Sequence, residues 1–477
     1  MTTLIISLAI LIGGYFIYGL IVEKILGIDP KRTMPAYAKT DGIDFMPMPT
    51  WKVFLIQFLN IAGLGPIFGA IMGVMFGPAA FLWIVFGTIF AGAVHDFTSA
   101  LIIIRSGGAS LPEIVGNELG NKVKQVMRGF SLLLLVLVGT VFIVSPAELI
   151  AGMTPDYLDK SFWVAIIFVY YVLATLLPID KLIGNLYPVF GLSLLFMACG
   201  LLFVLLFGDV TIPDGLSEGL YSRQSSGSPI FPMMFVSIAC GAISGFHATQ
   251  SPMMARCLKN EKLTRPVFYG AMVAEGIVAL IWAAATIAFT GGYEELAAYM
   301  ADGNSPGILV KDISMTWLGT AGGILAIVGV IAAPISTGDT ALRSARLIVA
   351  DALGFDQKKL WRRLIISIGI FAAVIMFMMI DFSVLWRYFA WCNQTLAVFT
   401  LWAVTVWLAR HRKAYFITLL PAMFMTAVSI SYLLSAPQPE GLGLPMPVAL
   451  GTGCMAGLVT LAIFFYWRSK RSVSFTE

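Results

Sequence analysis

Apolar segments of about 20 residues recur along this chain, and a helix of that length spans the hydrocarbon core of a bilayer. Charged residues make up only 12% of the 477 positions, which excludes a soluble fold. We therefore predict an all-α integral membrane protein with about 13 transmembrane helices, whose tenth and eleventh segments meet at Asp381. The thirteen segments are Thr3–Val22, Val53–Phe76, Pro78–Ile104, Phe130–Ile150, Ser161–Leu177, Leu186–Phe207, Ile230–Gln250, Val267–Thr290, Met315–Ser336, Leu364–Ile380, Phe382–Leu408, Tyr415–Leu434 and Val448–Trp467.

The lysine and arginine residues gather in alternate connections between these segments. Cytoplasmic loops of membrane proteins carry an excess of these residues, so alternate connections are predicted to share the cytoplasmic side. The pattern predicts a multi-pass protein of the inner (plasma) membrane, with the N-terminus outside and the C-terminus in the cytoplasm. The basic connections include residues 24–52, 105–128, 256–265, 343–363 and 410–413.

Two of the apolar segments, Val53–Gly77 and Pro229–Met254, carry glycine, proline and polar residues in their middles. Non-helical backbone at membrane depth persists only inside protein or beside a water-filled cavity, because lipid cannot satisfy its N–H and C=O groups. A matched pair of interrupted segments therefore points to the binding site of a transporter.

The two interrupted segments are the second and the seventh, and their spacing predicts the organisation of the chain. They lie five segments apart, and an odd spacing makes two successive five-helix units enter the membrane in opposite directions, which is an inverted repeat. The expected units are an extra N-terminal helix that remains as an anchor (1–26), two five-helix repeats (52–208 and 229–410), and two C-terminal helices with a cytoplasmic tail (414–477).

The first interruption reads IAGLGP. Gly63 and Gly65 permit non-helical dihedral angles, and Pro66 suits the first turn of a restarted helix. The free N–H groups of that second half-helix would favour an anion, and Gln57 and Asn60 lie one or two turns before it. The alternative interpretation is that the glycines only allow helices to pack closely.

The second interruption reads CGAISGFHATQSPMMAR and includes Ser244, His247, Gln250 and Ser251. Histidine and glutamine at membrane depth are costly and are more often functional than structural. We expect these four residues to contact substrate, with a coupling role as a second interpretation for His247. Asn393 and Gln394 in the eleventh segment are expected to serve packing more than to line a cavity.

Three ionisable residues, His95, Asp96 and Glu275, lie within the third and eighth segments and are candidates for proton coupling. The alternative for the first two is a structural pair, and for Glu275 a hydrogen-bonded clamp between helices. A metal site made by both histidines and Asp96 is the least favoured interpretation, so no metal is predicted, and the five cysteines are expected to be small packing residues. No nucleotide-binding loop, hydrolase motif or zinc motif is present, which predicts no enzyme, no cofactor and no nucleic-acid partner.

Several long motifs resemble the carbon-starvation protein A (CstA) family. They are TDGIDFMPMPTWKVFLIQFLNIAGLGPIFGAIMG, VHDFTSA, SLPEIVG, CGAISGFHATQSPMMARC and STGDTALRSAR. The resemblance implies an inner-membrane carrier of peptides or pyruvate that moves with protons. It also implies a LeuT-like fold, with substrate between the second and seventh segments and a sodium site made by Ala62, Ser336 and Thr337.

We therefore predict a secondary active transporter that imports a short peptide or pyruvate by alternating access, with H⁺ favoured over Na⁺ as the coupling ion. Its predicted partners are a small-molecule substrate and the lipid bilayer, and its oligomeric state is left open. The competing hypotheses are a channel, a membrane-embedded enzyme that uses His95, Asp96 and His247, and a transporter-like nutrient sensor.

Overall fold

The computed structural model describes residues 1–41, 45–176, 183–213, 219–224, 227–355 and 360–473, and every regular element in these ranges is a helix. Short π- or 3₁₀-helical turns lie at Thr88–Gly92, Ile230–Met234, Glu261–Leu263 and Arg265–Tyr269. The α-helices are α1 (Thr2–Leu26), α2 (Pro35–Ala38), α3 (Thr50–Ile61), α4 (Gly65–Val74), α5 (Ala79–Gly87), α6 (Ala93–Arg105), α7 (Leu111–Leu119), α8 (Asn121–Ala151), α9 (Lys160–Leu176), α10 (Ile183–Phe207), α11 (Phe235–Ser237), α12 (Gly245–Ala255), α13 (Gly270–Thr290), α14 (Tyr293–Ala301), α15 (Pro306–Leu353), α16 (Leu360–Met378), α17 (Phe382–Arg410), α18 (Phe416–Ser435) and α19 (Met446–Val473).

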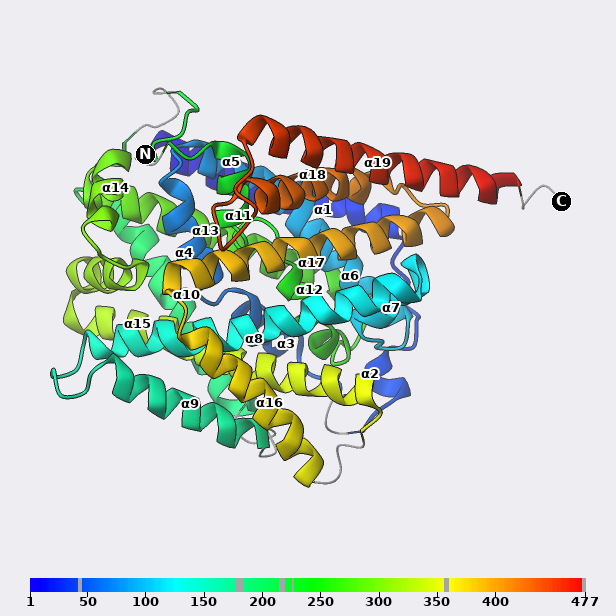
Figure 1. The fold of residues 1–477 in the computed structure, drawn as a ribbon, viewed down its shortest axis with the longest axis horizontal. Coiled ribbons are helices and arrows are strands. Elements are labelled where there is room, and N and C mark those ends of the chain that lie inside the picture. Colours follow the sequence, from blue (N-terminus) through cyan, green and yellow to red (C-terminus); the bar gives the residue numbers. More distant parts are fainter. Residues whose placement is uncertain (42–44, 177–182, 214–218, 225–226, 356–359, 474–477) are drawn as a thin grey trace.

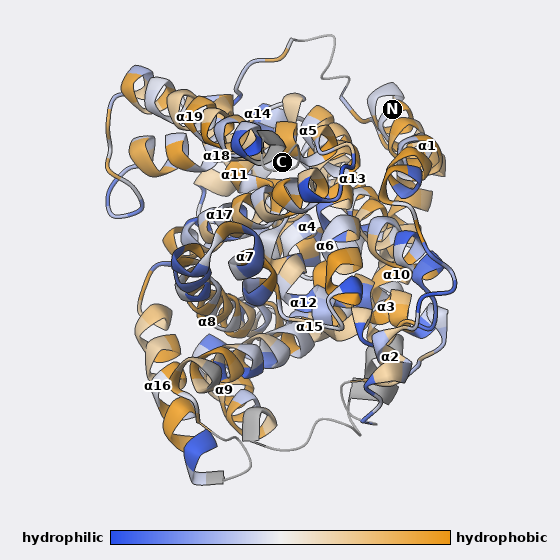
Figure 2. Cartoon of the chain, turned by 90° about the vertical axis from the view of Figure 1, so that its right-hand side faces the viewer, coloured by the Kyte–Doolittle hydropathy of each residue, from blue (hydrophilic) through white to orange (hydrophobic). Residues whose placement is uncertain are grey.

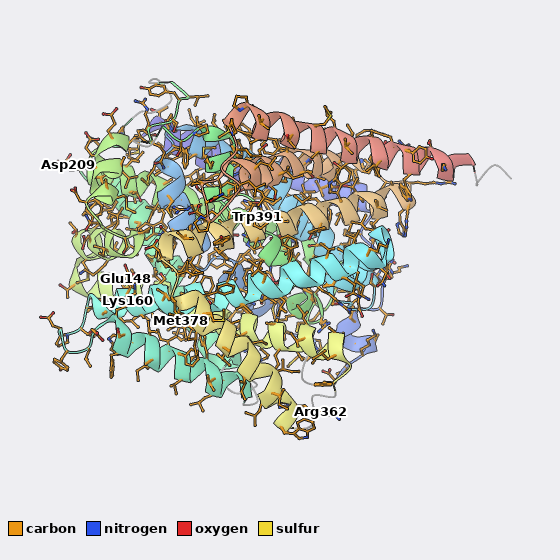
Figure 3. All side chains as sticks on the ribbon, in the orientation of Figure 1. Glu148, Lys160, Asp209, Arg362, Met378 and Trp391 are labelled. Carbon is orange, nitrogen blue, oxygen red and sulfur yellow. The ribbon has the colours of Figure 1, made fainter. Side chains whose placement is uncertain are left out.

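The long helices run roughly side by side, and the two chain termini lie at opposite ends of the bundle (Figure 1). Glu148 and Lys160 form an ion pair of 2.8 Å at the same end as Asp209, whereas Arg362 lies away from that end (Figure 3). Termini at opposite ends require an odd number of membrane crossings if the bundle axis is the membrane normal.

Ten helices in the described ranges are long and apolar enough to cross a membrane, or eleven if the bent pair α3 and α4 forms one span. This is fewer than the thirteen predicted, and the difference has two causes. The fifth expected segment is a shorter apolar helix, Lys160–Ala174, and the seventh is interrupted in its middle. Length and hydropathy alone do not identify such segments as spans.

The most deeply buried helices form the centre of the bundle. In the most apolar windows of Ala79–Arg105, α8 and Glu261–Thr290, 78% of the residues are buried, whereas only 22% are buried in α1 and α19. The peripheral helices α1, α16 and α19 consist mainly of hydrophobic residues (Figure 2), and Ile17, Ile368 and Ile463 on them are exposed. An apolar perimeter around a buried core is what a bilayer requires of a bundle.

Helix α15 contains the predicted ninth segment, Met315–Ser336, and is longer than it. The helix extends from Pro306 to Leu353 and is interrupted only at Gly319, where φ is 68° and ψ is 177°. The helix therefore continues beyond the apolar stretch, and Asp339 and Arg346 lie inside it and are buried.

The boundary predicted at Asp381 is confirmed. Helix α16 ends at Met378 and α17 begins at Phe382, with Asp381 between them. The Asp381 carboxylate accepts a hydrogen bond of 2.9 Å from the backbone N–H of Ser383, and so caps α17.

Candidate functional site

The first interruption lies where the sequence predicts it. Helix α3 ends at Ile61, α4 begins at Gly65, and their axes differ by 45°. Ala62 leaves the helical region with φ −84° and ψ 41°. Pro66 occupies the first turn of α4, where the absence of a backbone N–H has no cost.

The second interruption is longer. Helix α11 ends at Ser237 and α12 begins at Gly245. Ile238 has φ −88° and ψ 60°, and Ser244 is extended with φ −142° and ψ 123°. The residues between them are non-helical and buried, so their backbone polar groups must find partners inside the protein.

Glycines on one face of α4 bring the two interruptions into contact. A Cβ added to Gly65 would lie 2.3 Å from the Cβ of Cys240, and one added to Gly73 would lie 2.1 Å from Cγ1 of Ile238. Packing of α4 against the second interruption therefore requires these glycines, which matches the packing interpretation of Gly65. Gly63 is different, because its added Cβ would lie an ordinary 3.6 Å from Phe142.

Two amides of α17 hold the second interruption. The Oδ1 atom of Asn393 accepts hydrogen bonds from Ser244 Oγ (3.0 Å) and from the backbone N–H of Phe246 (2.7 Å). Gln394 Nε2 donates to the Phe235 carbonyl at 3.1 Å. Asn393 thus satisfies a first-turn N–H of α12, as an N-cap side chain would. The sequence favoured mere packing for both residues, although two adjacent amides in an apolar segment are a signal of such a role.

The predicted ionisable residues meet beside this interruption and form a chain, which we call the acid–histidine chain. Asp96 on α6 contacts His95 Nδ1 through Oδ1 (2.8 Å) and His247 Nδ1 through Oδ2 (2.9 Å). His247 on α12 places its Nε2 atom 3.3 Å from Oε2 of Glu275 on α13. All four residues are fully buried. The structure thus joins His247, predicted mainly as a substrate contact, to the three residues predicted for proton coupling.

An imidazole between two carboxylates has a definite chemical capability. It can take a proton on one ring nitrogen and release one from the other, which is the basis of a relay. A buried ionised carboxylate is unfavourable in a membrane unless it is paired, so Asp96 and Glu275 depend on His95 and His247 for partners.

Several buried polar atoms near the interruptions have no hydrogen-bond partner within the described part of the chain. Both side-chain polar atoms of Gln57 and of Asn60 belong to this group, as do Gln250 Oε1 and Thr337 Oγ1. Helices α12 and α15, which carry Gln250 and Thr337, pack against α3, which carries the other two. An unpaired buried amide costs about 1–3 kcal/mol, so these groups are suited to bind a polar solute.

The predicted hydroxyl residues mostly bond to their own helices. Ser251 Oγ donates to the carbonyl of His247 at 2.9 Å, and Ser336 Oγ donates to that of Ala333 at 2.8 Å. Ala62 lies at the first interruption, and α15, which carries Ser336, contacts both α3 and α4.

One group in the described ranges has the spacing of metal ligands. Its members are Cys240, His247 and Glu275, whose ligand atoms all lie within 4.8 Å of one another. This group differs from the set that the sequence suggested, which was both intramembrane histidines with Asp96. Cys240 was predicted to be a packing residue, but its sulfur also lies near the ligand atoms of His247 and Glu275.

Comparison with protein families gives a match over most of the chain. The sequence profile described as "Carbon starvation protein CstA" matches residues 1–156, 147–300 and 282–432. An uncharacterized membrane protein of Haemophilus influenzae is 46% identical over 329 residues, which cover 59% of this chain and 89% of the relative.

Two relatives with functional names are more distant. The peptide transporter CstA of Bacillus subtilis is 28% identical over 347 residues, covering 60% of this chain and 58% of the relative. The pyruvate/proton symporter BtsT of Escherichia coli is 26% identical over 343 residues, covering 58% of this chain and 47% of the relative. This chain therefore spans about half of the length of such relatives.

Among solved structures, a mutant of the manganese transporter of Eremococcus coleocola shares the fold. The TM-score is 0.56 at 13% identity, over 91% of this chain and 99% of the other. At this identity the likeness concerns the fold alone.

Proposed function

This chain belongs to the carbon starvation protein CstA family, and we propose that it is a secondary active transporter for a small carboxylate-bearing nutrient, either a short peptide or pyruvate. The names of the relatives, which include peptide transporters and a pyruvate/proton symporter, support this substrate class. The fold that the chain shares with a solved manganese transporter is compatible with transport, but at 13% identity it identifies neither the activity nor the solute.

The acid–histidine chain is the observation that carries the proposal. Three helices contribute to it, and α12 is one half of an interrupted segment. A proton that moves along Asp96, His247 and Glu275 would change the charge pairing between α12 and its neighbours. Because a buried charge must be paired, protonation would favour one arrangement of these helices over another. We propose that proton and solute movement are coupled in this way, with alternating access around the two interruptions.

The solute is proposed to bind between α3–α4 and α12. Its carboxylate would face the N-terminus of α4, where free N–H groups and the helix dipole favour an anion. The unpartnered amides of Gln57 and Asn60 support this placement, because a solute would satisfy them. The other proposed contacts are Gly63, Gly65, Ser244, Gln250 and Ser251. His247 is proposed both to contact the solute and to carry the proton.

The finer topology is part of the proposal. We propose thirteen crossings in a LeuT-like 5+5 inverted repeat, with repeats at 52–208 and 229–410, one helix before them and two after. Termini at opposite ends of the bundle support an odd number, and the basic connections support an outside N-terminus and a cytoplasmic C-terminus in the inner membrane. Ala62, Ser336 and Thr337 are the proposed site should the coupling ion be Na⁺.

Uptake into proteoliposomes tests this function. Labelled pyruvate and labelled dipeptides would be offered under a proton gradient and, separately, under a sodium gradient. The expected result is saturable accumulation of one solute class with the proton gradient, and loss of that accumulation in folded His247→Ala protein.

The matched control is His411→Ala, because His411 is an exposed loop histidine whose ring bonds to the carbonyl of Trp407. Uptake should survive that change. Full accumulation in His247→Ala protein would contradict the assignment, and chemical conversion of the solute would favour an enzyme instead.

A further inference from the structure

Cys240, His247 and Glu275 bring together a thiol, an imidazole and a carboxylate at the second interruption. Cys240 lies in the non-helical stretch, His247 on α12 and Glu275 on α13. Their exposed fractions are 4%, 0% and 0%. We propose that these three residues bind a divalent transition-metal ion of the zinc class, an ability that goes beyond solute and proton transport.

The ligand types select the class of metal. Sulfur and imidazole nitrogen favour zinc-like ions over Mg²⁺, Ca²⁺ and Mn²⁺, which prefer oxygen ligands. Three protein ligands leave a fourth position of a tetrahedral ion open for water or another small ligand. Bonds of about 2.0–2.3 Å would place such ligands roughly 3.5 Å apart. The ligand atoms lie within 4.8 Å of one another, so small side-chain movements suffice to bring all three within bonding distance of one ion.

Second contacts orient two of the three ligands. His247 Nδ1 is engaged by Asp96 Oδ2 at 2.9 Å, which turns Nε2 toward Glu275, and Asp96 itself is held by His95. Asn393 Nδ2 lies 3.3 Å from Cys240 Sγ and donates to it. A carboxylate behind the histidine and a donor beside the sulfur are the outer contacts that metal ligands usually have.

The ligand atoms of His247 and Glu275 are also the ones left without hydrogen bonds. Within the described residues, His247 Nε2 and both carboxylate oxygens of Glu275 have no hydrogen-bond partner, although Nε2 and Oε2 are 3.3 Å apart. Buried polar atoms in native proteins are almost always satisfied. A divalent cation would satisfy His247 Nε2 and one carboxylate oxygen of Glu275, and it would neutralise the negative charge of the thiolate and the carboxylate together.

A bound ion would connect the second interruption to α13 and occupy part of the acid–histidine chain. Metal binding and proton movement would therefore compete for His247 and Glu275. The proposal concerns binding alone, so it is tested without any transport measurement, and its outcome is separate from that of the uptake experiment.

Titration of the purified full-length protein with Co²⁺ in detergent tests the site. A cobalt–thiolate bond produces a charge-transfer absorption band in the near ultraviolet, and Zn²⁺ should displace Co²⁺ and remove it. We expect one ion per chain in the wild type and no charge-transfer band in Cys240→Ser. Cys257→Ser is the matched control, because this buried cysteine lies outside the group, in the turn after α12, and donates to the carbonyl of Met253.

Asp96→Asn supplies a second, milder test. This substitution keeps all three ligands and removes the carboxylate behind His247, so the band should remain while affinity falls about 10–100-fold. Thermal unfolding of each variant identifies those that are folded, and Cys240→Ala replaces Cys240→Ser if the latter is not. The proposal is overturned if the folded wild type gives no thiolate band, if Cys240→Ser keeps it, or if Cys257→Ser loses it.

Discussion

Replacing Asn393 with alanine should loosen the second interruption in a measurable way. In the wild type, Asn393 Oδ1 is the acceptor for Ser244 Oγ at 3.0 Å and for the Phe246 amide at 2.7 Å. All three residues are buried, so water cannot replace the lost acceptor. Alanine would leave two donors unsatisfied at the start of α12.

The expected magnitude follows from the hydrogen bond to the Phe246 amide. An unsatisfied buried donor costs about 1–3 kcal/mol. The local opening that exposes this amide should become easier by that amount, which corresponds to roughly a 5- to 150-fold faster exchange. The unsatisfied Ser244 hydroxyl lowers the free energy of global unfolding further, but it does not directly change the exchange rate of the Phe246 amide.

Hydrogen–deuterium exchange followed by mass spectrometry measures the effect on peptides that cover residues 244–250. Asn393→Asp keeps an acceptor oxygen and should retain most of the protection. Thr400→Ala is the control on the same helix, since the buried Thr400 hydroxyl donates to the carbonyl of Leu396 within that helix. Unchanged exchange at residues 244–250 in folded Asn393→Ala would refute the capping role.

Two further comparisons test the packing at Gly65 and the ion pairs of Glu261 and Glu148. Gly65→Ala should lower the free energy of unfolding by about 1–3 kcal/mol through overpacking, because the added Cβ would meet Cys240. Gly63→Ala should have a small effect on thermal unfolding, because its added Cβ would lie 3.6 Å from Phe142. Equal effects of the two substitutions would contradict the close contact at Gly65. Glu261→Ala removes the buried carboxylate that pairs with Arg32 (2.7 Å) and Arg105 (2.5 Å). Because Arg32 is 38% exposed, we expect a loss of about 2–3 kcal/mol, below the roughly 3–5 of a fully buried pair. Glu148→Ala, which breaks the exposed pair with Lys160, should cost about 0–1 kcal/mol, and a cost as large as that of Glu261→Ala would refute this ranking.

The sequence was sufficient to locate the two interruptions, because a plain membrane anchor rarely carries glycine, proline and polar residues together in its middle. It also placed Asp96, His247 and Glu275 in the membrane. It did not show that they meet, since 151 positions separate Asp96 from His247 and only tertiary packing brings them together.

The same limit explains why the role of Asn393 was missed. Asn393 lies 147 positions after Phe246, whose amide N–H donates to it, and a pair of adjacent amides in an apolar segment does not show which distant residue they contact. Helix α15 extends beyond the predicted span for a different reason. Hydropathy reports where the apolar stretch stops, whereas the backbone hydrogen bonds of a helix continue through polar residues such as Asp339.

Coupling of proton movement to solute transport by the acid–histidine chain is the main proposal for this protein. The most direct test records proton flux with a pH-sensitive dye inside proteoliposomes. Solute is added outside, and no proton gradient is imposed. We predict proton entry with solute in the wild type. We also predict that folded Glu275→Gln, compared with the wild type, loses this proton entry but still exchanges labelled for unlabelled solute. Proton entry of equal size in Glu275→Gln and the wild type would contradict the proposed coupling.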